Sequence, residues 1–305
     1  MHLYRSLIFV PGIRENMIEK ARGFDADVIA LDLEDSVPPA EKEQARQIVQ
    51  RAVPTLAALG HTVHVRVNPV GSGLTRDDLA AVVCPQLSGV SLPKVESAQD
   101  IRDIDVLIRE QELEHAVKPG TLVLIPAIES ARGVLRCEEI CRASTRLTAI
   151  ALGADDYTAD LGVHRTREGR ELDYARQVMA VCARAADILA LDTPFADFRD
   201  EEGLVRESEW VRSLGFKGKY LIHPSQIGPV NRVFRPSEEE VAYACRLVEA
   251  FEEAVARGHG AVQVDGRMVD QPVAKRARAL IEMARAIQAR EQSRQPAGQA
   301  GSSTG

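Results

Sequence analysis

The sequence predicts an α/β fold, a closed (β/α)8 barrel of the TIM type followed by a C-terminal helical lid extension. Eight short apolar segments alternate with helical ones along residues 6–222, which is the count for such a barrel. The chain has 305 residues, 45% of them hydrophobic, and a barrel needs about 250 residues. A doubly wound open sheet is the alternative, but no glycine-rich dinucleotide fingerprint follows the first strand.

Local patterns place each element of the barrel. Aliphatic runs of strand length predict strands at residues 6–10, 28–33, 64–67, 90–92, 122–125, 147–152, 188–191 and 220–222. Helical spacing of apolar residues predicts helices at residues 14–22, 38–59, 75–83, 98–115, 130–142, 173–186 and 201–214. Pro38 and Pro39 can open the second helix because proline is accepted in the first turn.

The segment after the eighth strand has its own pattern. Pro236 and Ser237 cap a helix over 238–257, a hairpin turns at Asp265 and Gly266, and Pro272 starts a helix that reaches about residue 290. We therefore expect three parts: a barrel over 1–235, a helical lid segment over 236–291 and a tail over 292–305. The tail is polar and rich in glycine, serine and proline, so we expect it to be disordered.

Composition excludes several classes of protein. The formal net charge of −7 argues against a general nucleic-acid binder, which needs clustered lysine and arginine. No run of about 18 apolar residues predicts a membrane span, and the N-terminal apolar run is too short for a signal peptide. We interpret the cysteines as thiols in a reducing cytoplasm rather than as zinc ligands or disulfides. They are Cys84, Cys137, Cys141, Cys182 and Cys245.

Acidic residues follow two neighbouring strands of the predicted barrel. Glu129 comes after the run at 122–125, and Asp155 and Asp156 come after the run at 147–152. The helical segment between the runs makes a β-α-β unit, which returns both strand ends to one edge of a parallel sheet. Carboxylates gathered there favour a hard divalent cation. The alternative is unrelated surface carboxylates that cap loops.

Ionisable groups also follow most of the other strands. Because a barrel carries its chemistry at the C-terminal ends of its strands, we expect these groups to share one rim. We interpret Glu129 and Asp156 as Mg²⁺ ligands, and Glu34 and Asp35 as partners of metal-bound waters and neighbouring cations. Arg66 is a candidate clamp for a substrate carboxylate. Its alternative is an internal ion pair with Glu34 or Glu96. The other rim groups are Arg14, Asp32, Asn68, Lys94, Glu96, Asp155, Asp192 and His223.

Eight sequence motifs, in unbroken order over roughly residues 5–285, resemble the citrate lyase β-subunit-like family within the HpcH/HpaI aldolase superfamily, whose relatives include malyl-CoA and citramalyl-CoA lyases. The resemblance implies a (β/α)8 barrel, Mg²⁺, and reversible cleavage of a 3-hydroxy-3-carboxyacyl thioester into an acetyl thioester and a 2-oxo acid. The motifs are RSLIFVPG (5–12), DLEDSV (32–37), RVNP (66–69), LPKVES (92–97), IPAIESARG (125–133), LGADDYTADLG (152–162), IHPSQI (222–227) and GRMVDQPV (266–273).

The resemblance also implies roles for single residues. Glu129 and Asp156 match the family's magnesium ligands, and Arg66 matches its substrate-carboxylate arginine. Many relatives have glutamate at the position of Asp155, which leaves the ligand position intact but alters its surroundings. The positions that contact coenzyme A in malyl-CoA lyases are matched by Phe9, Arg14 and Lys20.

In this family the C-terminal segment is a lid that covers the site of a neighbouring subunit, and Asp270 matches its acid/base residue. The resemblance thus implies a homo-oligomer, a trimer or a hexamer, that binds a CoA thioester and a small 2-oxo acid. From its own surroundings Asp270 would be a helix N-cap before Pro272. The expected reaction is a retro-Claisen cleavage in which Asp270, Arg66, Glu34 and Asp35 take part.

Other functions remain open at this stage. The chain could be a citrate lyase β subunit that acts on a citryl thioester of an acyl carrier protein, or a malyl-CoA thioesterase. A non-catalytic acyl-CoA binder would not need metal ligands, an anion clamp and a lid acid together. CoA-free pyruvate aldolases share the barrel but use a histidine base, and His223 is the one histidine that follows a predicted strand directly. Its alternative role is a hydrogen bond to a buried loop.

Overall fold

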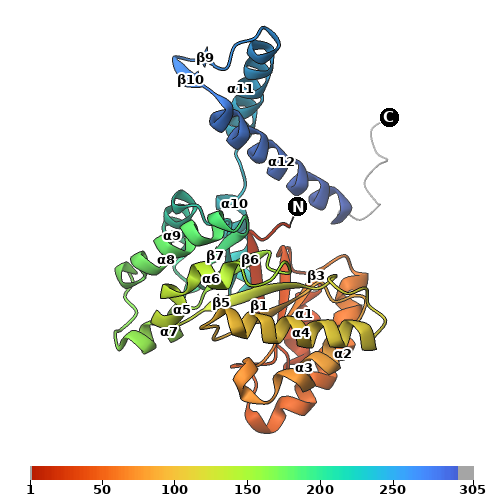
Figure 1. The fold of residues 1–305 in the computed structure, drawn as a ribbon. Helices are drawn as coiled ribbons and strands as arrows, with labels where there is room; N and C mark the ends of the chain where they lie inside the picture. The colour runs from red at the N-terminus through yellow and green to blue at the C-terminus, as the bar shows by residue number, and fades with distance from the viewer. Residues whose placement is uncertain (1, 295–305) are drawn as a thin grey trace, which may run out of the picture. The chain divides into compact units, whose positions relative to one another are not determined.

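The computed structural model describes residues 2–294 and contains a closed barrel of eight parallel strands that neighbour one another in sequence order. This confirms the predicted fold class (Figure 1). The strands are β1 (Ser6–Pro11), β2 (Val28–Asp32), β3 (Thr62–Arg66), β4 (Gly89–Leu92), β5 (Val123–Ile128), β6 (Ala149–Leu152), β7 (Leu189–Asp192) and β8 (Gly218–Leu221). The barrel closes where β1 pairs with β8, with Ser6 opposite Lys219 and Ile8 opposite Leu221.

The strands are buried on both faces, as their unbroken aliphatic sequences predict. Side chains of one parity fill the inside of the barrel, where Ala30, Ala151, Leu191 and Tyr220 belong to one apolar cluster. Side chains of the other parity, such as Leu31, belong to the larger cluster beneath the helices. Because side chains alternate between the inside and the outside of the barrel along each strand, only every second side chain can reach the cavity at its C-terminal end.

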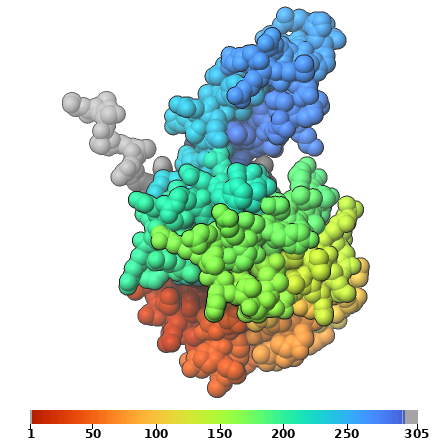
Figure 2. All heavy atoms as spheres, turned by 90° about the vertical axis from the view of Figure 1, so that its left-hand side faces the viewer, coloured from red at the N-terminus to blue at the C-terminus, as the bar shows by residue number. Residues whose placement is uncertain are grey.

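Helices surround the barrel (Figure 1), and Figure 2 shows one face of this unit with all its heavy atoms drawn. The α-helices of the barrel are α1 (Glu15–Ala21), α2 (Lys42–Ala58), α3 (Thr75–Val82), α4 (Ala98–Glu114), α5 (Ala131–Leu135), α6 (Cys137–Cys141), α7 (Ala154–Leu161), α8 (Asp173–Ala185), α9 (Glu201–Leu214) and α10 (Ile227–Val233). Short 3-10 helices are η1 (Pro39–Glu41), η2 (Val70–Ser72), η3 (Arg170–Leu172) and η4 (Pro224–Gln226).

The structure differs from the expected elements after β5 and β6. The helix expected over 130–142 is two short helices, α5 and α6, which meet at Arg136. Helix α7, which the sequence pattern did not reveal, starts directly after Gly153 and ends at Gly162 in the left-handed conformation. It carries Asp155 and Asp156 in its first turn, where the helix dipole favours negative charge.

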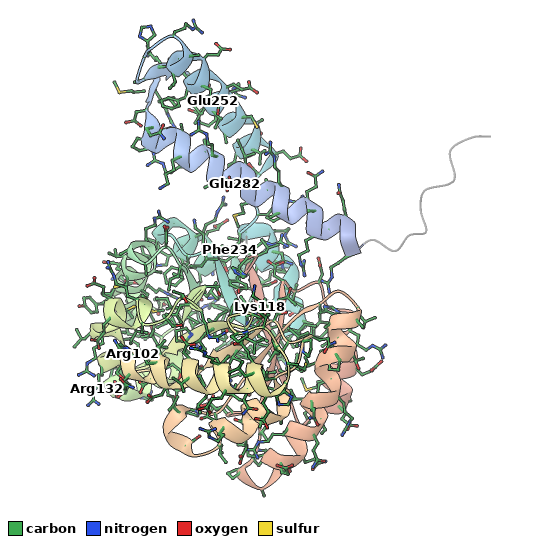
Figure 3. The ribbon with its side chains drawn as sticks, turned by 45° about the vertical axis from the view of Figure 1, so that its right-hand side comes forward. Arg102, Lys118, Arg132, Phe234, Glu252 and Glu282 are labelled. Atoms are coloured by element: carbon green, nitrogen blue, oxygen red, sulfur yellow. The ribbon has the colours of Figure 1, made fainter. Side chains whose placement is uncertain are left out.

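Residues 2–3 and 235–294 belong to a second compact unit, and the barrel unit spans Tyr4–Phe234 (Phe234 is labelled in Figure 3). Within the second unit, Phe251, Val269 and Ala274 are buried in a separate apolar cluster. Glu252 (Figure 3) forms an ion pair with Arg278 at 3.1 Å. The elements are α11 (Glu238–Ala256), β9 (Val262–Val264), β10 (Arg267–Val269) and α12 (Gln271–Arg294).

The hairpin and the last helix of this second unit can be compared with the sequence predictions. The hairpin turns at Asp265 and Gly266, with φ of 50° and 78°, which is the geometry of a tight hairpin turn. Helix α12 continues to Arg294, so residues 292–294 of the expected tail are helical, and 295–305 lie outside the described residues. Within residues 2–294, no helix has both the length and the apolar character to cross a membrane.

A buried ionic network joins β7, β8 and the helices outside them. The guanidinium of Arg176 donates to both carboxylate oxygens of Asp192 at 2.9 and 3.0 Å. Lys219 donates to Asp192 and, at 2.6 Å, to Glu207. Burial favours the protonated form of Asp192, but Lys219 and Arg176 outweigh it and lower the pKa of this carboxyl to about 2. Asp192 therefore has a structural role beneath the helices, which corrects its expected place among the rim groups.

We expect Lys219→Met to lower the free energy of unfolding by about 3 kcal/mol or more, because it leaves buried carboxylates with one cation instead of two. Urea unfolding of the purified chain measures this loss. Lys118→Met is the matched control, because Lys118 is exposed (Figure 3). Equal losses in the two variants would contradict the role given to the buried network.

Candidate active site

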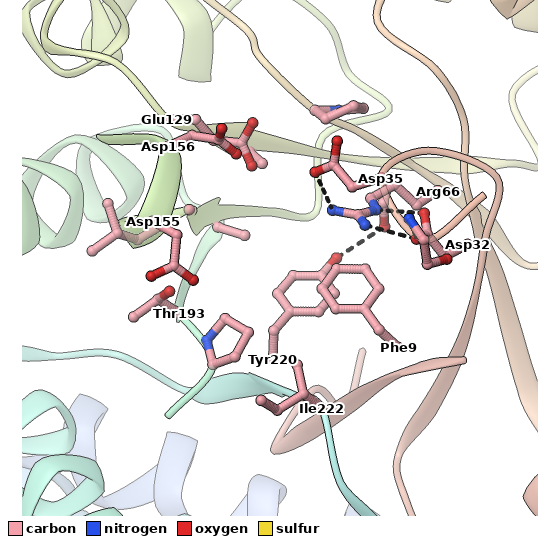
Figure 4. Close-up of a pocket in the computed structure, with 18 of the residues that line it drawn as sticks. Phe9, Asp32, Asp35, Arg66, Glu129, Asp155, Asp156, Thr193, Tyr220 and Ile222 are labelled. Atoms are coloured by element: carbon pink, nitrogen blue, oxygen red, sulfur yellow. Dashed lines mark hydrogen bonds and ion pairs between the residues drawn. The ribbon is translucent and has the colours of Figure 1, made fainter. Parts of the chain in front are cut away.

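A cavity of about 470 Å³ lies at the C-terminal ends of the barrel strands. Its lining combines carboxylates, one arginine and apolar side chains, and Figure 4 shows how they face one another. Glu129 and Asp156 lie at one side and Arg66 with Asp32 at the other, with Phe9 and Tyr220 nearby (Figure 4). The expected rim site is therefore a real concavity that contains both proposed metal ligands and the proposed anion clamp.

Glu129 and Asp156 lie side by side in this cavity (Figure 4). Glu129 follows β5 and is only 8% exposed, while Asp156 lies in the first turn of α7. Burial and the neighbouring charge of Asp156 raise the pKa of Glu129 to about 7, although the N–H of Lys94 donates to Glu129 and favours its ionised form. Burial and mutual repulsion thus disfavour the ionised form of Glu129 beside Asp156. A cation bound between the two carboxylates would stabilise that form.

The donor set decides which cation would fit. Among the described residues, no group of three or more histidine, cysteine, aspartate or glutamate side chains could hold a metal ion. Zinc sites use three or four such ligands, whereas Mg²⁺ takes one or two carboxylates and completes its octahedron with water and substrate oxygens. The pair of Glu129 and Asp156 therefore fits Mg²⁺.

Arg66 is fixed by contacts on its edge and on its face. Asp32 accepts hydrogen bonds from Nε at 2.6 Å and from Nη2 at 2.8 Å (Figure 4). The guanidinium lies 4.5 Å over the ring of Phe9, which in turn stacks on Tyr220 with 4.5 Å between centroids. Nη1 of Arg66 lies 3.1 Å from Glu34 and 3.9 Å from Asp35.

These contacts revise the sequence expectation for Arg66. The ion pair with Glu34 is present, but Glu96 pairs with Arg132 instead. Arg132 points outward from the barrel unit (Figure 3). Asp32, the strongest partner of Arg66, was not identified as such from the sequence, although the register places it directly opposite Arg66 in the β2–β3 ladder. An alignment of the two strands in the sequence would therefore have predicted this cross-strand pair.

Glu34 and Asp35 lie on the loop after β2, close to the two cations of the rim. The ammonium of Lys94 donates to Glu34 at 2.6 Å and to Asp35 at 3.3 Å. Burial raises the pKa of Glu34, while the positive charges of Arg66 and Lys94 oppose that rise. Lys42 stabilises this loop, because its ammonium group donates to the carbonyls of Leu33 and Glu34 at 2.6 and 2.8 Å.

The remaining expected site residues occupy different surroundings. Asp155 is largely exposed and forms an ion pair with Arg165 at 3.0 Å. Phe9 lines the cavity, whereas Arg14 and Lys20 lie on the exposed surface at and within α1. His223 stacks on Phe198 and forms a hydrogen bond with Ser225 in its own loop, as its alternative interpretation expected, but this contact is exposed and not buried.

Two hydroxyl groups in the cavity wall were not expected from the sequence. The phenol of Tyr220 and the hydroxyl of Ser91 share a hydrogen bond of 2.9 Å, and both residues line the cavity. Burial raises the pKa of Tyr220, so this phenol stays protonated over the ordinary pH range. The sequence placed each of these residues within a strand. It did not show whether their side chains point into the barrel or toward the helices.

Asp270 belongs to the second unit and lies just before α12. One of its carboxylate oxygens accepts the N–H of Val273 at 3.2 Å, and its carbonyl accepts the N–H of Ala274 at 2.9 Å. This is the geometry of a helix N-cap, the role that its local sequence suggested. An acid/base role for Asp270 stays a prediction.

Gly153 leaves the space that Glu129 occupies. A Cβ atom at this position would lie 2.4 Å from both Cγ and Oε1 of Glu129. We expect Gly153→Ala to displace the carboxylate and to lower Mg²⁺-dependent turnover by about 10²-fold. Gly71→Ala is the matched control, because a Cβ at Gly71 meets nothing within 4 Å. Steady-state kinetics on both variants make the comparison, and equal turnover would contradict the packing role of Gly153.

Comparison with known proteins identifies the family of this chain. The family model for HpcH/HpaI aldolase/citrate lyase matches residues 5–224. The citrate lyase subunit beta of Leuconostoc mesenteroides subsp. cremoris is 42% identical over 284 residues, covering 93% of this chain and 94% of that protein. The mitochondrial citramalyl-CoA lyase of Homo sapiens is 34% identical over 298 residues, covering 93% and 86%.

A solved structure shares both the fold and much of the sequence. It is CitE from Mycobacterium tuberculosis in complex with magnesium, acetoacetate and coenzyme A, with a TM-score of 0.72 and 31% identity over 92% of this chain and 97% of that chain. These matches confirm the family expected from the sequence motifs. The chain belongs to the HpcH/HpaI aldolase/citrate lyase family.

Proposed function

We propose that this protein is a Mg²⁺-dependent carbon-carbon lyase. It would cleave a 3-hydroxy-3-carboxyacyl-CoA of the malyl-CoA or citramalyl-CoA type into acetyl-CoA and a 2-oxo acid, reversibly. The observation that carries the proposal is that the buried Glu129 and the solvent-exposed Asp156 line the same cavity as Arg66. A metal beside an anchored carboxylate is what a retro-Claisen cleavage of such a hydroxy acid requires.

Residues of this chain would divide the work as follows. Glu129 and Asp156 would hold Mg²⁺, which when bound withdraws electron density from the substrate's hydroxyl or carbonyl oxygen. Arg66 would anchor the substrate carboxylate, and its position is already fixed by Asp32 and Phe9. Such a preset cation orients the substrate without further loss of side-chain freedom. Glu34 and Asp35, which adjoin Arg66 and Lys94, would hydrogen-bond metal-bound water and keep these cations in place.

Proton transfers complete the proposed reaction. In cleavage, the hydroxyl proton leaves to a base while the bond between the hydroxyl-bearing carbon and the acetyl carbon breaks. The electron pair passes to the acetyl thioester as an enolate, and Asp270 would protonate it; in condensation, Asp270 would remove a proton from the acetyl methyl group. Phe9, Arg14 and Lys20 are the proposed contacts of coenzyme A. We also propose a homo-oligomer, a trimer or hexamer, in the cytoplasm.

A second candidate is a citrate lyase β subunit that acts on a citryl thioester of an acyl carrier protein. The 42% identity to the Leuconostoc subunit favours it. In both candidates the metal pair and Arg66 have the same tasks, and the carrier of the acyl group differs.

One experiment tests the proposal. The purified chain is incubated with MgCl2, acetyl-CoA and, in turn, glyoxylate, pyruvate or oxaloacetate, and the products are identified by mass. A hydroxy-carboxyacyl-CoA product that disappears in EDTA is expected. Turnover of the acyl-carrier-protein thioester alone would select the second candidate. Release of free CoA from malyl-CoA without a 2-oxo acid would indicate a thioesterase, and full activity in EDTA would contradict the metal assignment.

A further inference from the structure

The turn that leaves β4 has an unusual backbone at Lys94. Its φ is +56°, in the left-handed region that residues other than glycine seldom adopt. The N–H of Lys94 donates to Oε2 of Glu129 at 2.9 Å. The next N–H, that of Val95, donates to the carbonyl of Ala127 at 3.2 Å. Two successive amides of this turn thus bind the same segment, β5 and the residue that follows it.

A regular strand cannot make this pair of contacts. In extended backbone, successive N–H groups point to opposite sides of the strand, so only every second amide can reach a given neighbour. The left-handed residue rotates one peptide relative to the next, as it does in a bulge. At Lys94 this rotation turns one amide toward the side chain of Glu129 while the following amide continues the ladder to Ala127.

The surroundings hold this turn in place. A Cβ atom at Gly133 would lie 2.7 Å from the carbonyl oxygen of Val95, so α5 approaches the turn closely only because residue 133 is glycine. On the other side, the ammonium of Lys94 is 2.6 Å from Glu34. Backbone strain that is held from several sides is typical of functional sites.

We propose that Lys94 is a positioning residue for Glu129, and that it acts through its main chain: the left-handed conformation directs the Lys94 N–H at Oε2 and so fixes the rotation of the metal-binding carboxylate. This inference rests on the proposed function, in which Glu129 holds Mg²⁺. Oε1 of Glu129 packs against Gly153, so the two oxygens are constrained by different elements. The side chain of Lys94 has a separate task, which is to neutralise Glu34 and Asp35.

The test separates the main chain from the ammonium group. Lys94→Gly and Lys94→Asn tolerate the left-handed region, whereas Lys94→Val carries a β-branched side chain that strongly disfavours it. All three variants lose the ammonium group, so that loss cancels in the comparison. Isothermal titration with MgCl2 measures the affinity of the full-length chain for the ion directly, without substrate or turnover.

We expect Lys94→Gly and Lys94→Asn to bind Mg²⁺ with similar affinity, and Lys94→Val to bind it about tenfold more weakly or worse. Thermal unfolding in EDTA checks that the variants are folded. Should Lys94→Val not fold, Lys94→Thr against Lys94→Asn makes the same comparison, because threonine is β-branched but carries a polar hydroxyl in place of one methyl group.

Two results would overturn the inference, and they differ in kind. Equal Mg²⁺ affinity of the glycine or asparagine variant and a folded β-branched variant (valine or threonine) would show that the Lys94 backbone does not position Glu129, and would leave the proposed function intact. Absence of Mg²⁺ binding by the wild-type chain would contradict the proposed function and, with it, this inference.

Discussion

Glu129→Gln is expected to lower Mg²⁺-dependent turnover by about 10³-fold or more, because an uncharged amide replaces one of only two carboxylates that would hold the ion. The same substitution is expected to stabilise the metal-free protein at high pH. Burial and Asp156 raise the pKa of Glu129 to about 7 from 4.5. Ionising this group in the folded chain therefore costs about 3 kcal/mol, and glutamine avoids that cost.

The sign of the pH effect follows from the raised pKa. Because the folded state binds this proton more tightly than the unfolded state, the wild type gains stability from it at low pH. That contribution falls away as the pH rises from about 4.5 through about 7. In EDTA, Glu129→Gln should thus be more stable than the wild type at pH 8, and this advantage should shrink toward pH 4.5. Urea unfolding at both pH values measures the difference.

Glu96→Gln is the matched control for this prediction. Glu96 also follows a rim strand, but it is half-exposed, pairs with Arg132 and does not line the cavity that contains Asp156. Its substitution should leave turnover and the pH dependence of stability near wild-type values. A Glu129→Gln protein with full Mg²⁺-dependent activity would remove Glu129 from the metal site, and with it the lyase proposal.

Asp270→Asn is expected to lower kcat by about 10²-fold or more while Mg²⁺ binding stays near normal, because asparagine cannot transfer a proton. Asparagine caps helices about as well as aspartate, and its side-chain oxygen can still accept the N–H of Val273. The substitution therefore preserves the N-cap and removes only the acid. Steady-state kinetics, thermal unfolding and titration with MgCl2 together measure the outcome.

Asp265→Asn is the matched control in the same unit. Asp265 has a φ of 50° in the hairpin turn, a conformation that asparagine also adopts readily. The turnover of the Asp265→Asn variant should equal that of the wild type. If Asp270→Asn also turned over at the wild-type rate, Asp270 would be a helix cap and nothing more.

The proximity of Glu129 and Asp156 could be predicted from the sequence because their geometry is local. Glu129 and Asp156 follow two strands joined by one crossover, and such a unit always returns both strand ends to the same edge. The crossover differs from the prediction, since it has a break at Arg136 and is followed by helix α7. Both strands nevertheless end at the same edge of the barrel, as predicted. Short helices of this kind carry too few apolar repeats for a periodic pattern to reveal them.

Other parts of the site depend on residues that are distant in sequence. The sequence made Arg66 a candidate clamp, but its pairing with Asp32 could be predicted only from the alignment of β2 with β3. The left-handed backbone of Lys94 has no signature in its own sequence, since it is held by contacts to Glu129 and Gly133. Such conformations persist only where the surrounding structure enforces them.

Two segments with nearly the same sequence show where local information ends. IALD (29–32) in β2 and LALD (189–192) in β7 both read as a buried strand that ends in aspartate, and the chain alone determined that much. Their parity relative to the barrel axis differs by one residue: Ala30 faces the interior in β2, whereas Leu191 does so in β7. Asp32 consequently reaches Arg66 in the cavity, and Asp192 reaches Arg176 beneath the helices. Only closure of the barrel decided this, because side chains alternate along a strand and a shift of one residue moves every one of them to the opposite face.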